Sequence, residues 1–245
     1  MNRLCTSTVV ILALGLLLAA PMPAAAADQE GPVAAQLRTL AEESAEQTPE
    51  EIQELARRAL ADIAESGVTQ SALKEGDPMP DFWLKDARGE DISSSDLLAD
   101  GHVVLVFYRG GWCPYCNLYL QAWQEYLPQL EEAGAHLVAI SAESVENSLD
   151  VEEKNALTYR VLSDGGYTVA RSFGIVFDVP EELAALFEGN GLNLVDYYGT
   201  DKAALPLSAT YVVSKDGVIT YSFLEVDYKV RAEPAEVVAA VKRIK

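Results

Sequence analysis

The chain has 245 residues, with 18 lysines and arginines against 38 aspartates and glutamates, so its formal net charge at pH 7 is −20. Such an acidic chain lacks the basic surface that binds nucleic acid or anionic lipid, and we predict neither as a partner. Its length is sufficient for one domain with a sizeable core and an appendage.

The first feature in chain order is an export signal at residues 1–27. Arg3 provides a short basic region, residues 8–20 form an apolar run, and Ala25 begins a stretch of small residues suited to cleavage. We therefore predict a protein that is exported to the periplasm or secreted by a bacterium, or one anchored to the envelope if the signal is not cleaved. Cleavage would remove Cys5 and leave two cysteines in an oxidising compartment.

Residues 28–75 form an acidic, alanine-rich segment that predicts two helices. The first helix spans Val33 to Ala45. The second follows a capping box at Thr48–Glu51, with proline at the first helical position, and stops near Gly67. One face of the second helix is apolar and must be buried on the main domain or on a partner, so this segment is either a packing appendage or the interface of a homodimer. The members of that face are Ile52, Leu55, Ala56, Leu60 and Ile63.

Residues 76–245 alternate strands and helices, which predicts a mixed α/β sheet with helices on both faces. Residues 174–207 are less regular. The predicted strands are Asp81–Lys85 at an edge of the sheet, His102–Tyr108 and His136–Ser141 in its interior, Tyr159–Leu162, and a hairpin of Thr210–Val213 with Val218–Phe223. The predicted helices are Ser93–Leu98, one from the cysteines to Ala133, Val145–Ala156, one ending at Phe173, Pro180–Phe187 and Pro234–Ile244.

The interior strand at His102–Tyr108 leads directly into a Cys-x-x-Cys sequence. Gly110 and Gly111 break the strand, and the chain then enters an amphipathic helix. Cys113 is expected at or beside the helix N-cap, and Cys116 in the first turn. Free backbone N–H groups and the positive end of the helix dipole favour a thiolate there, so the pattern predicts a thiol–disulfide redox site.

Four neighbours of the cysteines are candidate supporting residues. Arg109 is expected to stabilise a thiolate by its charge, the alternatives being a solvated arginine or an ion pair. Trp112 is expected to shield the thiols or to form part of a docking surface, the alternative being a tryptophan packed in the core. Pro114 and Tyr115 match the dipeptide of glutaredoxins, which indicates a dithiol of intermediate redox potential.

The remaining chemistry-bearing residues do not predict a cofactor. Two cysteines with only His102 and His136 elsewhere make a poor set of metal ligands. The chain also lacks a Gly-x-Ser-x-Gly elbow and a phosphate-binding glycine loop. We therefore predict no metal, nucleotide or flavin.

Several segments together resemble a known family. They are Gly76–Phe82, the strand into the cysteine turn, Leu162–Asp164 and Thr210–Val213. They look like a thioredoxin-fold peroxiredoxin of the alkyl hydroperoxide reductase/thiol-specific antioxidant family. The run Arg-Gly-Gly-Trp-Cys-Pro-Tyr-Cys is similar to the peroxiredoxin-like branch of that family. The resemblance covers about residues 74–245 and implies a thioredoxin-like fold and an antioxidant thiol oxidoreductase.

The chain departs from the usual residues of that family. Where peroxiredoxins have a proline, a threonine or serine, and the peroxidatic cysteine, this sequence has Arg109, Cys113 and Cys116. The family's late arginine and the cis-proline of thioredoxins both fall near Ser208, which makes Ser208 a candidate site residue, with Pro206 nearby.

The sequence leaves open which cysteine attacks. By the likeness to thioredoxins it is Cys113, the more exposed thiol, with Cys116 resolving. By the likeness to peroxiredoxins it is Cys116, with Cys113 resolving. The implied substrates are accordingly a peroxide or a protein disulfide, and an external dithiol is the implied reductant. The alternatives are an envelope thiol–disulfide exchange protein and a redox-responsive interaction module, in which the disulfide switches an interface made by residues 28–75.

Overall fold

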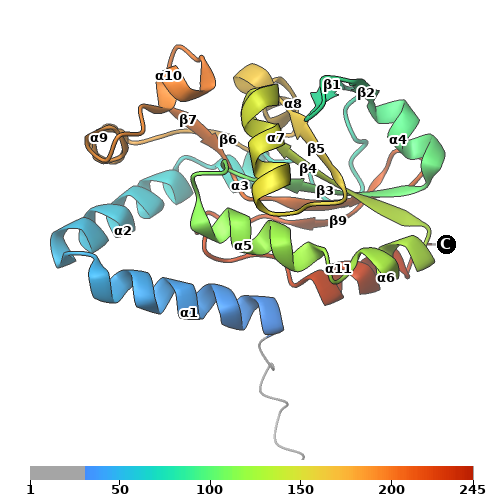
Figure 1. Ribbon diagram of the computed structural model, residues 1–245, viewed down its shortest axis with the longest axis horizontal. Coiled ribbons are helices and arrows are strands. Elements are labelled where there is room, and N and C mark those ends of the chain that lie inside the picture. The colour runs from blue at the N-terminus through green and yellow to red at the C-terminus, as the bar shows by residue number, and fades with distance from the viewer. Residues whose placement is uncertain (1–30, 245) are drawn as a thin grey trace, which may run out of the picture.

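The computed structural model describes residues 31–244 (Figure 1). The predicted export signal at residues 1–27 lies outside the described residues. Among the helices of residues 31–244, none has the length and apolar character needed to cross a membrane.

A seven-stranded sheet in the order β2-β1-β5-β4-β3-β8-β9 forms the centre of the molecule. The strands β3, β4 and β5 run parallel, and each of the outer strands pairs antiparallel with its neighbours in the sheet. The predicted mixed sheet is therefore confirmed. The strands are β1 (Trp83–Asp86), β2 (Asp91–Ser93), β3 (His102–Phe107), β4 (Ala135–Ser141), β5 (Arg160–Ser163), β8 (Thr210–Val213) and β9 (Ile219–Phe223).

The prediction that Asp81–Lys85 is an edge strand is wrong. The turn at residues 87–90 returns the chain into β2, which pairs antiparallel with β1 on one side, while β5 pairs with it on the other. The sequence did not show this because β2 has only three residues, too few to display an alternating pattern.

Helices cover both faces of the sheet, as the alternation of β3 requires. Val103, Leu105 and Phe107 pack into the core on one face, with α4 (Ser94–Asp100) and α8 (Thr168–Ser172). Val104 and Val106 pack into the core on the opposite face. The helices on that second face are α5 (Pro114–Trp123), α6 (Leu127–Glu132), α7 (Val145–Lys154) and α11 (Pro234–Val241) (Figure 1).

The single helix predicted from the cysteines to Ala133 is two helices. The helix α5 ends at Trp123, and α6 begins at Leu127 with Pro128 in its first turn. Proline has no N–H to donate and is tolerated only in the first turn, so the helix must restart near this residue.

Residues 174–207 contain more structure than expected. The predicted short helix is confirmed as α9 (Glu181–Gly189), and a second helix, α10 (Leu194–Tyr198), follows it. The strands β6 (Val176–Asp178) and β7 (Ala204–Pro206) pair antiparallel as a separate small sheet. Strands of three residues carry too little pattern to be recognised from sequence.

Both predicted N-terminal helices are confirmed as α1 (Pro32–Gln47) and α2 (Glu50–Glu65), and the short α3 (Val68–Ser71) follows them. The predicted capping box is wrong. Pro49, not Thr48, is the N-cap of α2, and no side chain caps this helix. The Thr48 hydroxyl instead donates a hydrogen bond to the carbonyl of Ser44 at 2.7 Å.

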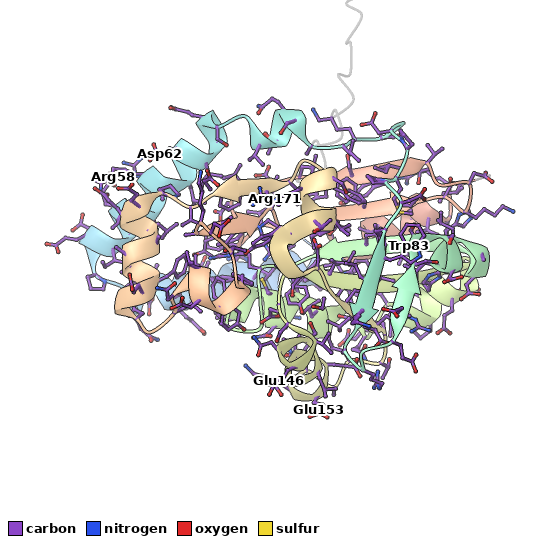
Figure 2. The ribbon with its side chains drawn as sticks, turned by 90° about the horizontal axis from the view of Figure 1, so that it is seen from above. Arg58, Asp62, Trp83, Glu146, Glu153 and Arg171 are labelled. Carbon is purple, nitrogen blue, oxygen red and sulfur yellow. The ribbon has the colours of Figure 1, made fainter. Side chains whose placement is uncertain are left out.

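The helix α1 lies along α5, and α2 lies beside α9 (Figure 1). Figure 2 shows Arg58 where α2 meets α9, and its guanidinium pairs with Glu182 at 3.0 Å. Ala59 and Ile63 of α2 are buried. The other members of the predicted apolar face, Ile52, Leu55, Ala56 and Leu60, are half-buried, so its own chain covers this face only in part.

Candidate active site

The dithiol lies at the start of α5, directly after the turn that follows β3. Cys113 is the N-cap, Pro114 is the exposed first residue of the helix, and Cys116 falls in its first turn. The expected placement of both cysteines is confirmed, and both are free thiols.

Each cysteine is 1% exposed, so the expectation that Cys113 is the more exposed thiol is wrong. The intervening Tyr115 packs edge-on against Tyr228 with ring centroids 5.4 Å apart. The helix α1 also packs along α5. The N-terminal helices and the segment after β9 therefore cover the start of α5, which the local sequence does not show.

The turn before the cysteines needs both glycines for reasons of space. A Cβ atom on Gly110 would lie 2.5 Å from Nε1 of Trp112, and one on Gly111 would lie 2.5 Å from a methyl group of Val151. The glycines therefore allow the turn to pack tightly against Trp112 and α7.

The charges around the dithiol converge on Cys116. Nη2 of Arg231 donates to Sγ of Cys116 at 3.4 Å. Burial by itself raises the pKa of Cys116, but a hydrogen bond from Cys113, the charges of Arg231 and Arg109, and the backbone N–H of Arg109 outweigh it and lower the pKa to about 5. The surroundings of Cys116 therefore favour its thiolate form.

The second thiol shifts in the opposite direction. Burial raises the pKa of Cys113 well above its ordinary value, and the hydrogen bond that Cys113 makes to Cys116 raises it further. Cys113 therefore stays protonated, and its S–H group donates a hydrogen bond to the Cys116 thiolate. The helix dipole alone would favour ionisation at the N-cap, but desolvation at Cys113 is the larger effect.

Arg109 is neither solvated nor ion-paired among the described residues. Its side chain is 5% exposed, and its guanidinium carbon lies 4.0 Å from the ring centroid of Tyr228 and 4.7 Å from that of Trp112. Its charge favours the thiolate form of both cysteines. This arrangement agrees with the expected electrostatic role.

Trp112 is half-buried and belongs to the wall of the site. Its Nε1–H donates to the hydroxyl of Tyr198 at 2.8 Å, and that hydroxyl in turn donates to the carbonyl of Arg109. Its ring packs edge-on against Phe187 of α9, with centroids 5.4 Å apart. Trp112 thus connects the cysteine turn to α9 and α10.

Ser208 lies in the same region but makes no contact that assigns it a role by itself. Its side chain is 3% exposed, and its hydroxyl has no hydrogen-bond partner among the described residues. The peptide bonds of the described residues, including that of Pro206, are trans, so the cis-proline of thioredoxins has no counterpart within residues 31–244.

Two functional residues were missed by the sequence analysis. Arg231 comes from the loop between β9 and α11, 115 residues after Cys116, and no spacing pattern connects the two. Glu143 follows β4 and is fully buried. Its carboxylate accepts hydrogen bonds from the N–H of Gly111 at 2.9 Å and from the hydroxyl of Tyr197 at 2.5 Å. Arg231 places a cation beside the thiolate. The resemblance to the family had implied an arginine near Ser208, where this sequence has none.

Within residues 31–244, no three His, Cys, Asp or Glu side chains gather in a way that would hold a metal ion. The chemistry that the described residues support is therefore that of the two thiols and the cations beside them.

The fold and the site together define a thioredoxin-fold protein with a buried, charge-stabilised dithiol. Residues 75–222 match the AhpC/TSA family, which is more than half of the chain. The chain belongs to the AhpC/TSA family. The predicted resemblance to this family is thereby confirmed.

Individual relatives agree with this assignment. The chain is similar to chloroplastic peroxiredoxin Q of Triticum aestivum, at 29% identity over 160 residues, which is 65% of this chain and 63% of that protein. It is 31% identical to chloroplastic peroxiredoxin Q of Sedum lineare over 147 residues, 60% of this chain and 67% of that protein.

A solved structure confirms the fold. Peroxidoxin BcpB from Mycobacterium tuberculosis superposes with a TM-score of 0.56 at 24% identity, covering 71% of this chain and 99% of that chain. The N-terminal helices α1 and α2 precede the matched family region.

Proposed function

We propose that this protein reduces hydroperoxides, with Cys116 as the attacking thiolate and Cys113 as the resolving thiol. The observation that carries the proposal is the opposite ionisation of the two cysteines. Arg231, Arg109 and the Cys113 thiol all favour the thiolate of Cys116, whereas burial keeps Cys113 protonated. A thiolate is the nucleophile that peroxide chemistry requires.

In the proposed first step, the Cys116 sulfur attacks the terminal oxygen of the hydroperoxide. An S–O bond forms, the O–O bond breaks, and the departing alkoxide or hydroxide takes the proton of the Cys113 thiol. The products are a sulfenic acid on Cys116, an alcohol or water, and a thiolate on Cys113. Arg109 and Arg231 stay protonated and offset the negative charge that moves onto the oxygens.

In the second step, the Cys113 thiolate attacks the sulfur of the Cys116 sulfenic acid. A disulfide forms and hydroxide leaves, which a proton from the buffer converts to water. An external dithiol then reduces the disulfide and restores both thiols. The relatives of this chain are peroxiredoxins by name, which supports a peroxide over a protein disulfide as the substrate.

The test is rapid mixing of the reduced protein with hydrogen peroxide, alongside Cys113→Ser and Cys116→Ser. Trp112 fluorescence follows the reaction, and dimedone traps sulfenic acid. We expect Cys113→Ser to form a trapped sulfenic acid quickly and then stop, because its resolving thiol is gone. We expect Cys116→Ser to react no faster than a free cysteine.

The reverse pattern would assign the attack to Cys113. If none of the three proteins reacts faster than free cysteine, the peroxidase proposal is wrong. Reduction of insulin disulfides by the wild-type protein would then favour the thiol–disulfide exchange alternative.

We also propose that the protein is exported, on the basis of the signal at residues 1–27. Expression of the full chain in a bacterium, followed by fractionation and mass spectrometry of the N-terminus, tests this proposal. A protein that begins near Asp28 in the periplasm or medium supports export, and one that keeps Met1 in the cytoplasm contradicts it.

A further inference from the structure

A groove of about 1180 Å³ runs between the N-terminal helices and the family domain, next to the dithiol. One wall comes from α2, with Ile52, Ala56 and Leu60. The opposite wall comes from α9 and β7, with Leu186 and Leu205. Apolar side chains line the middle of both walls, and charged residues such as Glu50, Glu54 and Arg57 of α2 stand among them.

Two buried polar side chains line the same groove, and each has one polar atom without a hydrogen-bond partner among the described residues. Arg109 is 5% exposed and its Nε has no hydrogen-bond partner among the described residues. Ser208 is 3% exposed and its hydroxyl is likewise unpaired within residues 31–244. An unsatisfied buried donor is destabilising, so a ligand oxygen that pairs with these groups would be favoured.

The combination of apolar walls and a polar base defines the ligand. We propose that this groove binds a single-chain acyl molecule, whose chain lies along α2 and whose polar head meets Arg109 and Ser208. The helices α1 and α2 lie outside the matched family region at residues 75–222, so this site is an addition to the family domain. The binding part of the proposal stands without the proposed peroxidase activity.

The direct test measures binding of saturated fatty acids of increasing length by displacement of cis-parinaric acid from the reduced full-length protein. We expect affinity to rise by roughly two- to fourfold for each added methylene until the groove is full, because each one buries more apolar surface. Affinity that does not change with chain length would overturn the proposal.

A matched pair of α2 variants locates the site. Ala56→Trp places an indole in the groove and should weaken binding of the best chain at least tenfold. Ala64→Trp adds the same side chain at an exposed position of the same helix, away from the groove lining, and should bind as the wild type does. Equal affinity of both variants would refute the assignment to this groove.

Two further variants keep the test decisive if Ala56→Trp does not fold. Leu186→Gln makes the opposite wall polar and should weaken binding without touching α2. Ser208→Ala removes one polar group at the base and should reduce affinity for a fatty acid more than for the alcohol of equal length. Unchanged affinity in both variants would contradict the proposal.

The role of the acyl chain rests on the proposed function and is measured separately. If hydroperoxides are substrates, kcat/KM for linear alkyl hydroperoxides should rise with chain length in wild type and stay flat in Ala56→Trp. Turnover of hydrogen peroxide should be equal in both. If the protein turns over no hydroperoxide, the proposed peroxidase activity is refuted. The measured binding of fatty acids would still decide whether the groove is an acyl site. Binding of fatty acids with no dependence of kcat/KM on chain length would make the acyl molecule an effector of the dithiol, not the tail of its substrate.

Discussion

At the scale of single residues, the reactivity of the dithiol depends on two arginines, one before the cysteines in the sequence and one far after them. Arg109 precedes the cysteines, whereas Arg231 follows β9 and donates directly to Cys116. Both guanidinium groups favour the thiolate of Cys116, and burial opposes it. In a buried site the loss of one cation is poorly compensated by water.

We predict that Arg231→Met raises the pKa of Cys116 by about 1 to 3 pH units, since one opposite charge at this distance has an effect of that size. The wild-type thiolate should persist as the pH falls from 8 to 6 and be lost near pH 5. The variant should lose it at a higher pH. Ultraviolet absorbance of the thiolate in the wild type and in Arg231→Met measures the two titrations, because the raised pKa of Cys113 keeps that thiol protonated over this range.

Arg243→Met, an exposed position on the last turns of the chain, is the control and should titrate as the wild type does. Arg109→Ala should raise the pKa in the same direction as Arg231→Met. An unchanged titration in both arginine variants would show that their charges do not stabilise the thiolate.

Glu143 is the second residue whose effect reaches the site. We predict that Glu143→Ala destabilises the fold by about 1–3 kcal/mol, because the buried N–H of Gly111 and the hydroxyl of Tyr197 lose their acceptor. Urea unfolding measures the change. Glu153→Ala, on the exposed side of the neighbouring α7, should stay within about 0.5 kcal/mol of wild type. Figure 2 labels Glu153 at the periphery of the molecule. An equal effect of the two substitutions would contradict a specific role of Glu143.

At the scale of elements, the strand–turn–helix unit around the cysteines is held by α7. The turn approaches α7 so closely that Gly111 has room for no side chain beside Val151. Close packing of this kind transmits a volume change directly to the backbone. The position of the dithiol therefore depends on a helix that contains neither cysteine.

We predict that Gly111→Ala destabilises the protein by about 1–3 kcal/mol through overpacking against Val151. Val151→Ala removes the methyl group in question and should rescue part of that loss. The coupling energy in a double-mutant cycle, measured by urea unfolding, should be favourable and above about 0.5 kcal/mol. Strict additivity of the two substitutions would mean that the clash is relieved elsewhere.

At the scale of the whole molecule, the segment after β9 connects the dithiol to the N-terminal helices. Arg231 contacts Cys116, and Tyr228 packs against Arg109 and Tyr115. Two residues after Arg231, the carboxylate of Glu233 accepts hydrogen bonds from the N–H groups of Val33 at 3.5 Å and of Ala34 at 3.1 Å. One short segment therefore holds the thiolate, its covering aromatic ring and the start of α1.

We predict that Glu233→Ala weakens the docking of α1, because Gly31 at its N-cap has no side chain to replace the carboxylate. A lost cap costs about 0.5–2 kcal/mol. Hydrogen exchange of the α1 amides should become faster, while that of β3 and β4 stays unchanged. Glu236→Ala, an exposed acidic residue in the first turn of α11, is the control. Equal exchange of α1 in both variants would exclude the cap.

The local sequence determined the parts of this protein that depend on near neighbours. The apolar run of β3, the paired glycines and the Cys-Pro-Tyr-Cys start of α5 all follow from backbone preferences over a few residues. The interior strands, the final hairpin and most of the helices were accordingly predicted within a few residues, whereas α5 and α6 were predicted as one helix. Two other signals that failed, β2 and the β6–β7 pair, are three-residue strands.

Tertiary structure decided what the site can do. Which cysteine ionises depends on Arg231, which is distant in sequence, and on the burial of Cys113. The spacing of residues in the sequence therefore does not predict which cysteine is the thiolate. The same holds for Glu143 beside Gly111, for Glu233 at α1, and for the groove that α2 forms with α9 and β7. Desolvation and charge act through space, and only the folded chain brings these groups within reach of one another.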